Sequence, residues 1–99
     1  MSVSPEDLAL VRAALSGFLA DQNAEAYLFG SRVSGAPRPD SDLDILLKRT
    51  AEIPFHELAR LKEAFEGSSL PFKVDIIDYH RIDDTFRRKI MAHAMKVEG

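Results

Sequence analysis

The chain has 99 residues, of which 45% are hydrophobic, and a formal net charge of −3. This composition excludes a disordered chain, and the length fits one domain, which we expect to span residues 1–99. The acidic balance argues against binding of long nucleic acid, and no apolar run is long enough to cross a membrane. Because cysteine is absent, disulfides and thiolate metal sites are excluded, and we expect a cytoplasmic protein.

The first half of the chain predicts one helix and one strand. Residues 4–7 (SPED) mark a helix start, because serine caps, proline fits the first turn and acids favour the positive end of the helix dipole. Apolar residues then recur at helical spacing to about residue 20. Residues 24–29 predict a strand buried on both faces and ending at a glycine. The segment 33–40, with two prolines, is expected to be mostly loop.

The second half predicts two more strands, each followed by a helix. The strands are expected over residues 43–48 and 72–78, and a helix between them is bounded by Pro54 and Gly67. A last helical stripe covers residues 82–97. The order is therefore helix, strand, short turn or helix, strand, helix, strand, helix. It predicts an α/β (α+β) fold in which helices flank a small, mixed, three-stranded sheet.

Two aspartates, Asp42 and Asp44, begin the second predicted strand. Side chains alternate between the faces of a strand, so both carboxylates lie on one face and Leu43 lies on the other. Adjacent like charges repel each other, so the pattern favours a cation between them. Magnesium prefers oxygen ligands and keeps positions open for water and substrate phosphate. The pair therefore predicts a magnesium site.

A glycine and a serine, Gly30 and Ser31, follow the first predicted strand. Glycine has no Cβ, so the backbone can turn sharply and a phosphate can approach it closely. If a short helix begins at Ser31, its first N–H groups point at that phosphate, and Arg32 adds a positive charge. We expect these residues to bind a triphosphate that faces the metal site.

The pattern of Gly30 and Ser31, ten intervening residues, and then Asp42-x-Asp44 resembles the signature of the DNA polymerase β-like nucleotidyltransferase superfamily. The segment FGSRVSGAPRPDSDLDILL is similar to its smallest members, the minimal nucleotidyltransferases. The resemblance covers most of the chain, since the element order and the later VDIID segment also match. It implies a magnesium-dependent enzyme that transfers a nucleoside monophosphate, AMP from ATP, to a hydroxyl acceptor.

The resemblance also implies a third carboxylate on a later strand, where VDIID offers Asp75 and Asp78. Being three positions apart, the two lie on opposite faces of a regular strand. We favour Asp75, because its place in the segment matches the family's third acid and because an unpaired carboxylate inside an apolar strand is costly. Asp75 would bind metal with Asp42 and Asp44 and help to activate the acceptor hydroxyl. Asp78 lies at the end of the strand and is as suitable a cap for the last helix.

The acceptor is not specified by the residues, because nearly all of the chain is used for the triphosphate site. Minimal nucleotidyltransferases are often paired with a HEPN-domain protein in toxin–antitoxin modules, so the resemblance implies a HEPN toxin as partner and acceptor. One alternative is transfer to a small molecule. Another is an antitoxin that neutralises its partner by contact without catalysis. The sequence leaves homo-oligomerisation open.

One basic cluster and three histidines complete the polar inventory. We interpret the cluster at residues 87–89 as a solvated helix face rather than a nucleic-acid contact. The histidines form no pair at ligand spacing, and we expect them at surface or capping positions.

Overall fold

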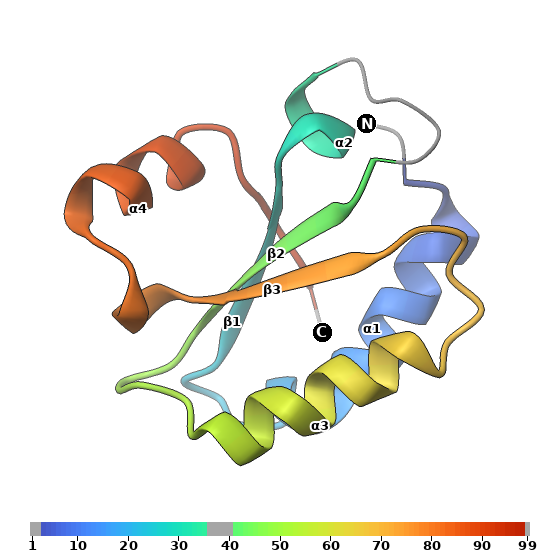
Figure 1. The fold of residues 1–99 in the computed structure, drawn as a ribbon, viewed down its shortest axis with the longest axis horizontal. Helices are drawn as coiled ribbons and strands as arrows, with labels where there is room; N and C mark the ends of the chain where they lie inside the picture. Colours follow the sequence, from blue (N-terminus) through green and yellow to red (C-terminus); the bar gives the residue numbers. More distant parts are fainter. Residues whose placement is uncertain (1–2, 36–40, 99) are drawn as a thin grey trace.

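The computed structural model describes residues 3–35 and 41–98 of the chain (Figure 1). Its elements are α1 (Pro5–Leu19), β1 (Glu25–Phe29), α2 (Ser31–Ser34), β2 (Leu43–Lys48), α3 (Phe55–Glu66), β3 (Val74–Asp78), the 3₁₀ helix η1 (Tyr79–Arg81), α4 (Asp84–Met91) and β4 (Met95–Lys96). Within the described ranges, no helix is long and apolar enough to cross a membrane. The predicted α/β fold, with helices flanking a small mixed sheet, is confirmed.

The strands form one four-stranded sheet in the order β3-β2-β1-β4. β1 pairs antiparallel with both β2 and β4, whereas β2 and β3 run parallel. In Figure 1 the sheet runs between α1 and α3 on one side and α4 on the other. β3 is an edge strand, so its residues are reachable from outside the sheet.

The hydrophobic core lies between the sheet and the pair α1 and α3. Alternate residues of β2, Leu43, Ile45 and Leu47, are fully buried in this core. Because strand side chains alternate, Asp44 and Leu46 point to the opposite face of the sheet. β1 alternates between buried and partly buried residues, so the prediction that it is buried on both faces is wrong. Only its residues Ala26 and Leu28 reach the core.

The last predicted helix is too long, and a short strand was missed. α4 ends at Met91, and Met95–Lys96 forms β4 against β1. The amide of Val97 donates a 2.8 Å hydrogen bond to the carbonyl of Ala26, and the Val97 side chain is buried in the core. The apolar spacing through residue 97 resembles that of a helix. The backbone N–H and C=O groups of this segment, however, are satisfied by pairing with β1 rather than by one more helical turn.

Candidate active site

The register of the parallel strands brings the predicted third acid to the other two. Asp44 of β2 lies directly opposite Asp75 of β3, and both belong to the face turned away from α1 and α3. Asp42 precedes β2 and is exposed, as is Asp75. The three carboxylates that the sequence singled out therefore lie in one region, close enough for the charges of Asp42 and Asp75 to act on Asp44.

Asp78 lies on the other side of β3 and has its own set of donors. The residue is only 3% exposed. Its carboxylate accepts hydrogen bonds from the amides of Ile53 at 2.7 Å and His80 at 3.0 Å. Arg81 adds an ion pair at 3.3 Å. Asp78 therefore caps η1, and the interpretation that it caps the last helix is wrong. Asp83 caps α4 instead, by accepting from the amide of Phe86.

Gly30 connects the end of β1 to the acids. It is the N-cap of α2 and has a φ of 88°, a conformation that favours glycine. A Cβ added at this position would collide with Oδ2 of Asp44. Ser31, exposed, begins the one-turn helix α2, as predicted. The close approach of Gly30 to Asp44 places the predicted phosphate cradle and the predicted metal ligands next to each other.

Arg32 has a well-defined structural role. The residue is 7% exposed, and its Nε donates a 2.6 Å hydrogen bond to the carbonyl of Ser41, just before β2. Its guanidinium also stacks on the ring of Phe72, 4.1 Å from the ring centre. Arg32 thus ties α2 to the starts of β2 and β3, and a phosphate contact for Arg32 stays a prediction.

The electrostatics of the acids indicate uncompensated negative charge. Burial raises the pKa of Asp44 to about 6, and the charges of Asp75 and Asp42 add to the rise. In the described ranges, no three His, Asp or Glu side chains are gathered closely enough to hold a metal ion as they stand. The donor set nevertheless fits magnesium, because all three groups offer carboxylate oxygens, two of them are exposed and can rotate, and a cation would relieve their repulsion.

We expect Asp44→Asn to stabilise the metal-free protein near neutral pH. The pKa of Asp44 is raised from 3.8 to about 6 on folding, because burial disfavours its charged form. The protonated side chain therefore contributes to the stability of the fold. That contribution is complete below about pH 3.8 and is lost as the pH rises through about 6. After allowance for screening by solvent, the gain at pH 8 is about 1 kcal/mol, or about 4–8 °C in Tm.

The measurement is thermal unfolding in EDTA at pH 4.5 and pH 8, with Glu63→Gln, which removes an exposed carboxylate outside the site, as the matched control. The gain from Asp44→Asn should be larger at pH 8 than at pH 4.5. A gain that is equal at both pH values would show that ionisation of the partly buried Asp44 is not the cause.

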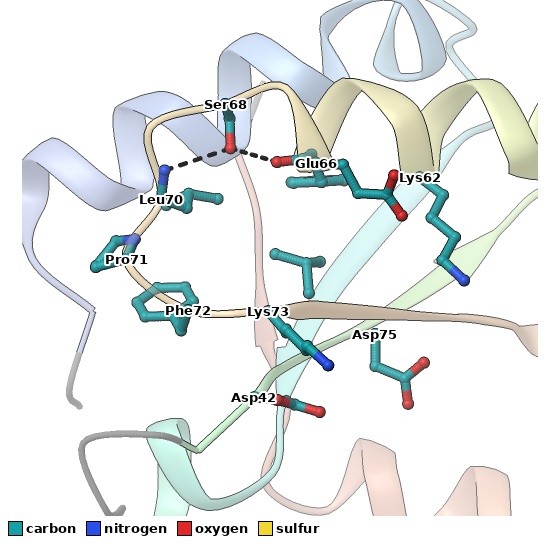
Figure 2. A pocket seen from close by; sticks show the side chains of 11 residues that line it. Asp42, Lys62, Glu66, Ser68, Leu70, Pro71, Phe72, Lys73 and Asp75 are labelled. Atoms are coloured by element: carbon teal, nitrogen blue, oxygen red, sulfur yellow. Dashed lines mark hydrogen bonds between the residues drawn. The ribbon is translucent and has the colours of Figure 1, made fainter.

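A cleft of about 810 Å³ reaches Asp42 and Asp75 from the side of β3. Figure 2 shows Asp42 and Asp75 at one side of this cleft, with Lys62 and Glu66 of α3 across it. Lys73 and the apolar side chains of Leu70 and Phe72, among others, complete its walls. No local sequence pattern indicates this cleft, because its walls come from α3, the following turn and β3. Gly30 does not line it, so the cleft approaches the acids from a side other than the predicted phosphate cradle.

Comparison with known proteins decides the family. The family described as polymerase beta, nucleotidyltransferase, matches residues 18–97, which include Gly30 and all three acids. The chain belongs to this nucleotidyltransferase family. A curated relative, the "Probable protein adenylyltransferase MntA" of Haemophilus influenzae, is 37% identical over 90 residues, which cover 91% of this chain and 77% of the relative.

Solved structures agree with this assignment. A structure assigned as a minimal nucleotidyltransferase is 32% identical to this chain and has a TM-score of 0.71. The match covers 96% of this chain and 95% of that chain. Two toxin–antitoxin structures, one of an MntA–HpeT mutant and one with AMP-PNP, have TM-scores of 0.73 and 0.75 at 16% and 18% identity. They cover 93% and 94% of this nucleotidyltransferase, which spans 73% of each of those chains, and at this identity they confirm the fold alone.

Proposed function

We propose that this nucleotidyltransferase, as one domain of residues 1–99, transfers AMP from ATP to a hydroxyl side chain of a partner protein. The observation that carries the proposal is the pairing of Asp44 with Asp75 beside Gly30. Family membership supplies the reaction class, and the names of the relatives, which refer to an adenylyltransferase and to AMP-PNP, support an adenine nucleotide.

Each part of the site has a role in the proposed transfer. Gly30 and Ser31 bind the triphosphate, and Arg32 holds α2 in place for that contact. Magnesium held by Asp42, Asp44 and Asp75 would neutralise charge on the phosphates and orient them. The acceptor oxygen bonds to the α-phosphorus, the bond from that phosphorus to the bridging oxygen breaks, and pyrophosphate leaves. Asp75 would accept the proton of the acceptor hydroxyl.

The acceptor enters by the cleft beside β3. This cleft contacts Asp42 and Asp75 without involving Gly30, so donor and acceptor approach the acids from different sides. Its volume of about 810 Å³ suits a polypeptide segment that carries a hydroxyl side chain. Two of the similar structures are toxin–antitoxin proteins, which supports a toxin partner, and the family resemblance indicates one of the HEPN type.

Nucleotide and metal binding test the donor side of the proposal. Magnesium with a non-hydrolysable ATP analogue should raise the Tm, because a ligand at a hundred times its Kd stabilises the fold by about 2.7 kcal/mol. EDTA should abolish the rise, and the Asp42→Asn/Asp44→Asn double variant, which lacks two of the three proposed metal ligands, serves as the control. A thermal shift of the same size with and without magnesium would contradict the metal site.

A further inference from the structure

A second, smaller pocket lies between the end of β1 and α4. It has a volume of about 230 Å³, and we call it the α4 pocket. Its lining residues are Phe29, Gly30, Phe86, Lys89, Ile90 and His93. Gly30 is common to this pocket and to the proposed phosphate cradle. A ligand bound at Gly30 would therefore have this pocket as its neighbour.

The residues that α4 contributes form one face of the helix and of the turn after it. Lys89, Ile90 and His93 follow Phe86 by three, four and seven positions, which is the spacing of one helical face. None of the described residues that line the pocket is acidic, although Gly30 also lies close to Asp44. The pocket thus combines aromatic and aliphatic walls with a lysine and a histidine.

Lys89 differs from the other two bases of its cluster. Arg87 donates to the carbonyl of Tyr79 at 2.7 Å and pairs with Asp84 at 2.8 Å, so the prediction that the whole cluster is a solvated face is wrong for Arg87. Arg88 is exposed and does not line the pocket. Among the described residues, none lies within ion-pair distance of Lys89. Its charge is therefore available to an anion at the pocket.

We propose that the α4 pocket is part of the nucleotide site, with Lys89 pairing with a phosphate and the ring of Phe86 stacking on the nucleoside. This inference rests on the proposed function, because it takes the triphosphate at Gly30 as its starting point. A lysine beside a phosphate and an aromatic ring beside a base are both favourable, and each acts on a different part of the ligand. His93 completes the polar wall of the pocket.

The test compares two probes by calorimetry with magnesium present: a non-hydrolysable ATP analogue and inorganic tripolyphosphate. Lys89→Gln should weaken the binding of both probes about tenfold, the scale of one charge-assisted contact. Arg88→Gln removes the same charge one residue away and should change neither Kd by more than about twofold. Phe86→Leu should weaken binding of the ATP analogue by about tenfold and leave the binding of tripolyphosphate unchanged.

Several results would overturn the inference. One is that the Lys89→Gln variant binds both probes with wild-type affinity. Another is that Arg88→Gln lowers the affinity as much as Lys89→Gln does, which would indicate a diffuse charge effect. A loss with Phe86→Leu that is the same for both probes would remove the stacking role. These failures differ from failure of the proposed function itself, in which the wild-type protein would bind neither probe.

Discussion

Asp75→Asn is expected to lower the rate of AMP transfer by at least about a hundredfold, the usual scale for loss of a general base. Asp75 is exposed beside Asp44 and also lines the cleft proposed for the acceptor. Asparagine has almost the same shape but cannot accept the proton of the acceptor hydroxyl. The triphosphate contacts at Gly30 and Ser31 are unchanged, so the Kd of an ATP analogue should change much less than the rate. Single-turnover transfer and calorimetry measure the two quantities separately.

Asp78→Asn is the matched control, because it makes the same chemical change on the opposite face of the same strand. Asp78 is buried and accepts from Ile53 and His80 while pairing with Arg81. Its replacement leaves donors without a full partner and should cost about 1–3 kcal/mol of stability in denaturant unfolding. At denaturant concentrations below its unfolding transition, the Asp78→Asn variant should keep nearly wild-type activity. The opposite pattern, with Asp78→Asn inactive and Asp75→Asn active, would mean that Asp75 is not the third acid.

Local patterns were sufficient to predict most of the elements and the acidic pair. Alternation in a strand is a property of the backbone, so Asp42 and Asp44 could be assigned to one face without knowledge of the sheet. The same rule separated Asp75 from Asp78, as the structure confirms. The boundaries of α1 and α3 were marked by prolines and, for α3, by the glycine that follows it.

The features that could not be predicted from the sequence depend on contacts between segments that are distant in the chain. β4 contains two residues, too few for any periodicity, and it forms only because the edge of β1 is open to it. The burial of the Asp78 carboxylate depends on a hydrogen bond from the amide of Ile53, far away in the chain. The α4 pocket requires that α4 lie near Gly30, and no local pattern of charges contains that information.

The structure also bears on how an enzyme and a simple binding protein could be distinguished here. Asp42 and Asp44 are outside the hydrophobic core, which uses Leu43, Ile45 and Leu47 from the same segment. Substitution of the acids therefore removes the proposed chemistry without removing the core of β2. Catalysis can be eliminated while the surface that a partner would contact keeps its shape.

The Asp42→Asn/Asp44→Asn double variant should fold, yet it should fail to add adenylyl mass to the partner and fail to neutralise it. The partner to test is the product of the neighbouring gene, for which we expect a small helical protein with an Arg-x4-6-His motif. Intact mass after incubation with ATP and magnesium reports transfer, and survival of cells that produce both proteins reports neutralisation. Removal of two of the three proposed metal ligands should lower transfer below detection, because charge neutralisation at the phosphates is lost.

Glu6→Gln/Glu63→Gln is the matched control, since it removes two exposed negative charges elsewhere and should keep both activities. The decisive comparison is between mass gain and protection. If the acid double variant protects cells as well as wild type, and neither protein adds mass to the partner, neutralisation occurs by contact. The transfer of AMP to this partner would then have to be abandoned, even though the chain has the fold of a nucleotidyltransferase, because the acceptor is a property of the site and not of the fold.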